Sequence, residues 1–167
     1  SNNLAIIYWE QGDFAQASLL MNEALEITRN IGNRRNQAYV SGNLASIERT
    51  LGRFVSSKRL MLEADLIFTR LKDDHAHHYV VGNLGDLDLI EGRLEDASDK
   101  FNAVASFAES IGDQELLTEC HVRFGEVAFY SGEIAKAELQ FRKAIGVAKA
   151  IDSGEYFMRA AIGLGRL

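Results

Sequence analysis

The 167-residue sequence contains no proline and only one cysteine, Cys120. Without proline, Gly, Asn and Asp are left to interrupt secondary structure, which favours long helices joined by tight turns. One cysteine cannot form an internal disulfide, which is compatible with a reducing compartment. The sequence also lacks an apolar run of about 18 residues, the length of a membrane span, and a leader of basic and apolar residues. We therefore expect a soluble, cytoplasmic protein that has no membrane partner.

Positive charge is also in short supply. The 18 Lys and Arg residues are outnumbered by 24 Asp and Glu residues, giving a formal net charge of −6. Binding to nucleic acid requires Lys and Arg concentrated on one face, to neutralise phosphates. The charge balance argues against a nucleic-acid partner and favours basic or neutral peptides.

A glycine with a bulky apolar residue two positions later recurs every forty residues, at Gly12, Gly52, Gly92 and Gly132. A fixed period of this size indicates a solenoid of stacked units, none of which buries its apolar face alone. We predict one array over residues 1–167, with repeats at 1–31, 32–71, 72–111 and 112–151 and a partial repeat at 152–167. The chain has no initiator Met and opens in the middle of a predicted helix, so we expect a piece of a longer protein.

Each repeat is predicted to contain two helices, A and B. The first B helix runs from the Gly12 turn to about residue 31, and its apolar stripe ends at Ile31; the matching stripes end at Leu71, Ile111 and Ile151. Helices A are expected at 34–51, 74–91, 114–131 and from 154 to the end, each preceded by a potential capping residue in Gly32-Asn33, Asp73-Asp74, Gly112-Asp113 and Asp152-Ser153. Counting the truncated first and last helices, we predict nine helices, no β-sheet, and Leu84 and Phe141 in the core.

The spacing of small and bulky residues resembles the tetratricopeptide repeat. Leu4-Ala5, Gly12, Ala17, Met21 and Ala24 follow its pattern of a Leu-Gly/Ala pair, an inter-helix Gly and two packing alanines, and the match is clearest at 39–45 and 79–85. HEAT and armadillo repeats share the period but not this spacing. The sequence is most similar to the forty-residue form found in Pins-type adaptors, kinesin light chains and bacterial signalling regulators. This resemblance implies an all-α, right-handed α-solenoid of antiparallel helix pairs that binds proteins as an adaptor or sensor.

Residue patterns for catalysis and metal binding are weak. No Ser or Cys has a partnered His in a recognisable signature, and the glycines follow the repeat rather than forming a phosphate loop. The segment 73–78, Asp-Asp-His-Ala-His-His, contains possible metal ligands, but a solvated helix start explains its polarity. We expect no enzyme activity, no metal and no cofactor.

The predicted binding surface is the face of the A helices that, by the resemblance, lines a concave groove. Asn3, Asn43 and Asn83 share one phase, and their amides can pair with a peptide backbone or else brace neighbouring helices. Gly42 and Gly82 leave room for a ligand backbone, while Arg123 suits an acidic ligand group. The predicted peptide-binding residues are Tyr39, Gly42, Asn43, Ser46, Arg49, Tyr79, Gly82, Asn83, Asp86, Glu119, Arg123, Glu126 and Arg159.

A second interpretation involves the apolar residues of the last predicted helix. Solenoids need terminal units with a polar outer face, and the sequence ends on Ile162, Leu164 and Leu167. These residues suggest self-association, for example as a homodimer through the terminal helices.

Overall fold

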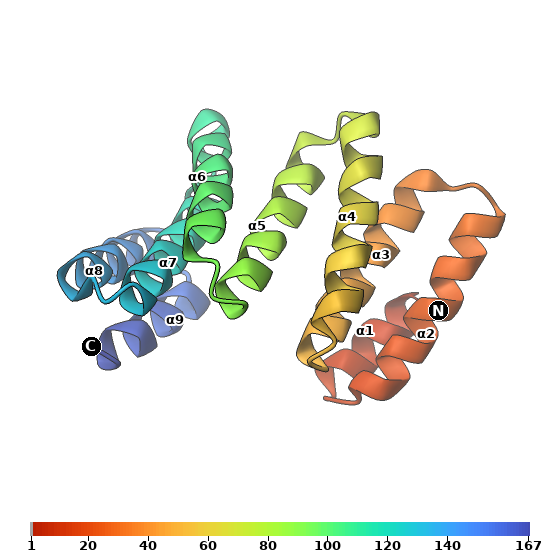
Figure 1. Ribbon diagram of the computed structural model, residues 1–167, viewed down its shortest axis with the longest axis horizontal. Helices are drawn as coiled ribbons and strands as arrows, with labels where there is room; N and C mark the ends of the chain where they lie inside the picture. Colours follow the sequence, from red (N-terminus) through yellow and green to blue (C-terminus); the bar gives the residue numbers. More distant parts are fainter. Residues whose placement is uncertain (1) are drawn as a thin grey trace. The chain divides into compact units, whose positions relative to one another are not determined.

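The computed structural model describes residues 2–167, and it describes side chains from Leu4 onward. Within this range the protein is entirely α-helical (Figure 1), which confirms the predicted all-α class and the predicted count of nine helices. The helices are α1 (Asn2–Glu10), α2 (Phe14–Asn30), α3 (Arg34–Thr50), α4 (Phe54–Leu71), α5 (Asp74–Ile90), α6 (Leu94–Ile111), α7 (Gln114–Tyr130), α8 (Ile134–Ala150) and α9 (Gly154–Gly165).

The contacts divide the chain into two units, the first ending at Val80 and the second spanning Val81–Leu167. In the first unit α1 packs on α2, α2 on α3 and α3 on α4; in the second, α6 packs on α7, α7 on α8 and α8 on α9. Helix α7 also contacts α9, so two successive A helices lie in one layer. This packing of helix pairs is that of an α-solenoid, as predicted.

The turns from helix A to helix B depend on the periodic glycines. Gly12, Gly52, Gly92 and Gly132 have φ angles of 79°, 73°, 76° and 77°, in the left-handed region that residues with a Cβ rarely adopt. Two of the reverse turns, from B to A, place a non-glycine residue in this region, namely Lys72 with φ 53° and Asp152 with φ 54°. The glycine period therefore follows from backbone geometry at the A-to-B turns.

Most of the predicted caps form. The side chains of Asn33, Asp73 and Asp113 accept bonds from the backbone N–H groups of Asn36, Ala76 and Leu116, at 3.1, 3.2 and 2.9 Å. The prediction is wrong for the last A helix, because within the described residues Ser153 makes no side-chain cap. The start of α9 relies instead on its backbone, with the N–H of Phe157 donating to the carbonyl of Ser153.

The core contains the alternating large and small residues of the B stripes. Leu84 and Phe141 are buried, as predicted, with 6% and 2% of their surface exposed. The predicted stripes are wrong at their C-terminal ends, where Ile31, Leu71 and Ile111 are exposed. These residues lie at the last position of a B helix or just beyond it, where the chain turns away from its packing partner.

A buried acidic residue near the end of an A helix recurs in both units. Glu48 accepts a hydrogen bond from Ser18 at 2.8 Å and pairs with Arg53 at 3.1 Å. Asp88 pairs with Lys100 at 2.6 Å and also with Arg93. Burial opposes ionisation of Asp88, but the bonds from Lys100 and Arg93 outweigh it and lower its pKa. These ion pairs join an A helix to the turn or helix that follows.

Candidate functional site

A pocket of about 430 Å³ opens on the A helices of the first unit. This volume falls within the usual range for ligand sites, about 300–1,000 Å³. The pocket is lined by residues of α3, α4, α5 and the α4–α5 turn, namely Ala38, Tyr39, Gly42, Asn43, Phe68, Asp73, His75, Ala76, Tyr79 and Val80. Four of these, Tyr39, Gly42, Asn43 and Tyr79, belong to the predicted groove. We call this cavity the groove pocket.

Gly42 gives the groove pocket its open floor. The residue is buried, yet outside the backbone of its own helix no atom lies within 4 Å of the position that a Cβ would occupy. A side chain added at this position would therefore enter the pocket instead of striking a neighbouring helix. Ser46, one turn further along α3, is also buried, and its hydroxyl donates to the Gly42 carbonyl at 3.3 Å.

Aromatic rings form the walls of the groove pocket. Tyr39 packs edge-to-face against Phe68 with 5.0 Å between ring centroids, and its hydroxyl lies 3.5 Å from Asp73. Asp73 is also paired with Arg35. Tyr39 and Tyr79 are 46% and 53% exposed, so both rings are accessible to a ligand. The half-buried Asn43 adds an amide that can donate and accept.

In the second unit the predicted groove residues bind one another. Arg123 is only 6% exposed, and its guanidinium donates to Asp86 at 2.8 and 3.0 Å and lies 3.2 Å from Glu119. It also lies over the ring of Phe101, at 5.4 Å. Although burial lowers its pKa, Asp86 and Glu119 raise the pKa of Arg123 further above its ordinary value. The acidic partners expected from a ligand are therefore supplied by the protein itself.

Arg123 also changes the role expected for Gly82. Its Nη1 atom lies 3.2 Å from the position of a Cβ at Gly82, so the guanidinium occupies the space expected for a ligand backbone. The asparagines of the two units also differ in accessibility, because Asn83 is buried whereas Asn43 is half-buried. The side chain of Asn3, the first member of the predicted series, lies outside the described residues.

The remaining predicted residues continue this network or lie at its edge. Arg159 lies 3.4 Å from Glu119 and over the ring of Tyr156, at 5.8 Å. Burial, with a smaller contribution from Glu119, raises the pKa of Tyr156 to about 12. Arg49, in the last turn of α3, is half-buried. Residues from α5, α7 and α9 thus form a continuous set of alternating charges in the second unit.

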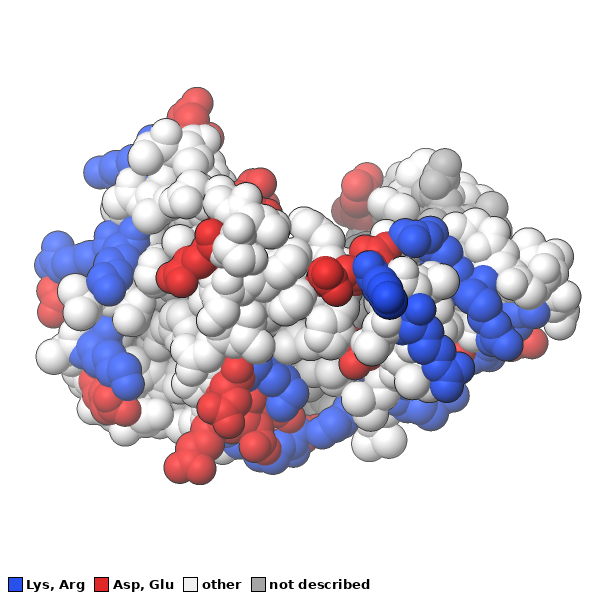
Figure 2. All heavy atoms as spheres, turned by 90° about the horizontal axis from the view of Figure 1, so that it is seen from above, with Lys and Arg blue, Asp and Glu red and all other residues white. Residues whose placement is uncertain are grey.

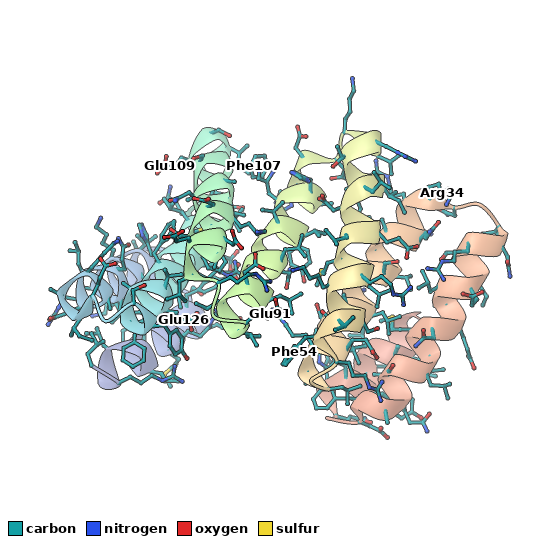
Figure 3. The ribbon with its side chains drawn as sticks, in the orientation of Figure 1. Arg34, Phe54, Glu91, Phe107, Glu109 and Glu126 are labelled. Carbon is teal, nitrogen blue, oxygen red and sulfur yellow. The ribbon has the colours of Figure 1, made fainter. Side chains whose placement is uncertain are left out.

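Glu126, labelled in Figure 3, has a raised pKa, because burial and then the charge of Asp86 disfavour its ionised form. A folded-state pKa above the unfolded value makes a carboxyl group costly to stability once the pH rises through that pKa. We expect Glu126→Gln to stabilise the protein at pH 7, by a modest amount on the order of 0.5 kcal/mol. The gain should vanish at a pH below the unfolded pKa of Glu, about 4.3. Thermal melts of both proteins at the two pH values test this, and a gain that grows in acid would contradict it.

The described residues contain no group of three or more His, Cys, Asp or Glu side chains arranged to hold a metal. In the 73–78 segment, His77 instead contacts Asp65 at 2.6 Å. Burial raises the pKa of the Cys120 thiol to about 12, which leaves little thiolate for nucleophilic chemistry at neutral pH. As for membranes, none of the described helices combines the length and hydropathy that a bilayer span requires.

Residues 1–64 match the model of a protein family described as "Tetratricopeptide repeat". Helix pairs with the same glycine at the A-to-B turn continue through α8, and one further A helix, α9, follows. The chain is similar to tetratricopeptide repeat proteins, and the family model covers its first 64 residues. Repeats of this family commonly serve as scaffolds for protein–protein interaction, using the extended surface that stacked units create.

Solved structures with low sequence identity share the fold of this chain. The crystal structure of BtubC (BKLC) from P. vanneervenii matches with a TM-score of 0.80 and 23% identity, over 90% of this chain and 63% of that one. A putative kinesin light chain from Podosopora anserina, with nearly identical TPR-like repeats, matches with a TM-score of 0.74 and 13% identity, over 99% of this chain and 85% of that one. The chain thus spans less than two thirds of BtubC. No curated protein matches its sequence significantly.

Proposed function

We propose that this protein binds a peptide segment of a partner protein in the groove of its A helices, as an adaptor or as the sensor module of a regulator. The observation that carries the proposal is the groove pocket, which has aromatic walls and an open floor at Gly42. It lies among residues that the tetratricopeptide resemblance predicts for ligand binding.

The lining of the groove pocket suits a peptide chain. Asn43 offers amide donors and an acceptor to the polar backbone of an extended segment, whichever side chains the segment carries. Tyr39 and Tyr79 add aromatic surface, since the two residues are 46% and 53% exposed. Because Gly42 has no side chain, a ligand backbone can approach α3 closely there. The groove pocket therefore supports recognition of a backbone together with one large side chain.

Filling the floor of the groove pocket is expected to block peptide binding. Peptides would first be selected from a random display library on the wild-type protein. Their affinities for Gly42→Leu, measured by fluorescence anisotropy, should then fall by at least about tenfold, equivalent to 1.4 kcal/mol. Asn43→Ala should weaken every selected peptide by a similar smaller amount, about 0.5–1.5 kcal/mol for one lost hydrogen bond.

Gly146→Leu is the matched control for Gly42→Leu. Gly146 is also in the interior of a helix with no atom within 4 Å of its Cβ position, but it lies on the exposed side of α8. Both substitutions replace a poor helix former, so neither should lower the melting temperature. Selected peptides that bind Gly42→Leu as tightly as the wild type would contradict binding in the groove pocket.

The alternative function, self-association, is favoured by one feature of α9. Met158 and Ile162 are one turn apart on this helix, and both are more than half exposed. Such a stripe can pair with the same stripe of a second copy around a twofold axis. A light-scattering mass that stays monomeric over a wide concentration range would remove this alternative.

A further inference from the structure

Charge is distributed unevenly along the chain. Residues 29–72 contain nine Lys and Arg residues but only Glu48, Glu63 and Asp65 as acids, a formal charge of +6 in a protein whose net charge is −6. Figure 2 shows Lys and Arg side chains gathered on the face of the first unit that carries the start of α3 and the end of α4. A local excess of this size attracts anionic groups even though the whole protein is acidic.

A second pocket of the first unit, about 290 Å³ in volume, lies within this basic segment. It is lined by Arg34, Gln37, Glu63, Leu66, Ile67, Arg70 and Leu71, and we call it the arginine pocket. Five of these residues belong to α4, a B helix, and none of them lines the groove pocket. The arginine pocket is therefore a separate surface from the one proposed above for peptide binding.

The only carboxylate in the arginine pocket is already paired. Glu63 accepts two bonds from Arg29, at 2.8 and 2.9 Å, and one from Gln37 at 2.8 Å. Burial raises the pKa of Glu63, but these bonds outweigh it and hold the pKa below its ordinary value. Glu63 thus remains ionised and committed to Arg29, and it does not neutralise the two arginines of the pocket.

Arg34 and Arg70 are the charges that remain available. Arg34, labelled in Figure 3, donates to the amide oxygen of Gln37 at 3.0 Å. Among the described residues, neither guanidinium is paired with a carboxylate. Beside them the apolar side chains of Leu66 and Leu71 are 53% and 39% exposed. Two unpaired cations thus adjoin an accessible apolar surface.

We propose that the arginine pocket binds an acidic peptide segment of a partner protein, with an apolar side chain on Leu66 and Leu71 and a neighbouring carboxylate on Arg34 and Arg70. Guanidinium groups pair with carboxylates through two parallel hydrogen bonds, so the orientation of the bound carboxylate is defined. An entirely apolar partner would remove water from the arginines without replacing the hydrogen bonds that the water made, at a cost in free energy. An acidic segment with an apolar residue complements both parts of the surface.

The test uses labelled synthetic peptides composed of Leu and Glu, with Leu and Gln peptides of the same length for comparison. The acidic peptide should bind at least about tenfold more tightly than the neutral one, and its affinity should fall as salt screens the charges. Arg34→Gln/Arg70→Gln should lose at least about tenfold in affinity for the acidic peptide. Lys143→Gln, which removes an exposed cation of α8, should bind it as the wild type does.

Two further variants keep the test independent of folding and of the groove. Leu66→Ala shortens a side chain that is 53% exposed, so the variant should still fold and yet bind the peptide more weakly. Gly42→Leu, which fills the groove pocket, should leave binding of the acidic peptide unchanged, so a failure of either proposal can be told from a failure of the other.

Several results would overturn the proposal. Equal binding of acidic and neutral peptides would do so, as would an unchanged affinity in Arg34→Gln/Arg70→Gln. If a single-stranded oligonucleotide displaces the acidic peptide as well as unlabelled peptide does, the surface binds polyanions in general. If the wild-type protein self-associates with rising concentration and the double variant does not, its occupant is a second copy of this chain.

Discussion

Replacing Phe141 with alanine is expected to lower the free energy of unfolding by about 3–5 kcal/mol. Phe141 is 2% exposed and packs in a cluster with Val122, Ala144 and Ala160. Its ring also fills the space left by two glycines: a Cβ at Gly125 would lie 2.5 Å from the ring, and one at Gly163 would lie 2.4 Å from it. Removing the ring therefore opens a cavity where α7, α8 and α9 meet. Urea unfolding of Phe141→Ala and the wild type measures the loss.

The same contact can be tested from the glycine side. Gly125→Ala should destabilise by about 1–3 kcal/mol through overpacking against Phe141. Gly146→Ala, on the exposed side of α8, should instead gain up to about 1 kcal/mol from helix propensity. Combining Gly125→Ala with Phe141→Leu should recover part of the loss, because the smaller side chain makes room for the new methyl group. Additive losses in the double variant would contradict a direct contact between the two residues.

The helix boundaries and turns could be predicted from sequence because their causes are local. Gly12 and Gly92 adopt a positive φ angle, which favours glycine. Asn33 and Asp113 each cap the helix that follows, by accepting a bond from the backbone N–H group three residues later. The forty-residue period then repeats each local signal, so one correct assignment fixes the others. Ser153 shows the limit of this approach, because its side chain could cap but does not.

Gly42 and Gly82 could not be distinguished by sequence. They share one phase of the A helices, but a Cβ at Gly42 would enter open space, whereas one at Gly82 would lie 3.2 Å from the Arg123 guanidinium. The difference depends on the large residue supplied by a neighbouring helix, which local propensity does not determine. For the same reason the sequence missed Phe68 and His75 as groove-pocket residues, since these come from α4 and from the start of the next A helix.

The pairing of Arg123 was also missed, because its partner Asp86 is 37 residues away in sequence. The forty-residue period was available as a signal, since positions 83 and 123 share one phase and Asp86 lies one turn beyond Asn83. We interpreted both charges as contacts for a ligand, whereas the structure joins them to each other. An alternation of opposite charges on successive A helices is thus better interpreted first as a bond between repeats.

Arg123→Met is expected to lower the free energy of unfolding at pH 7 by about 3 kcal/mol, the low end for breaking a buried ion pair. Methionine keeps much of the apolar volume of the side chain, so the loss reports mainly on charge. Without the guanidinium, Asp86 loses the cation that donates to it, and Glu119 keeps only its longer contact with Arg159, at 3.4 Å. Arg142→Met is the control, because the pair of Arg142 with Glu138 is exposed and its loss should cost less than about 1 kcal/mol.

The pH dependence of this loss identifies its cause. In Arg123→Met the half-buried carboxyl groups of Asp86 and Glu119 lose the guanidinium that stabilises their ionised form. The difference in stability between the variant and the wild type should therefore be largest at pH 7 and shrink as the pH falls toward 4. Urea unfolding at both pH values measures it, and a difference that stays constant would mean that packing, not charge, is lost.

Because Arg123 is paired within the protein, we expect it to affect groove peptides only by stabilising the fold. Arg123→Met should therefore weaken acidic and basic groove peptides alike.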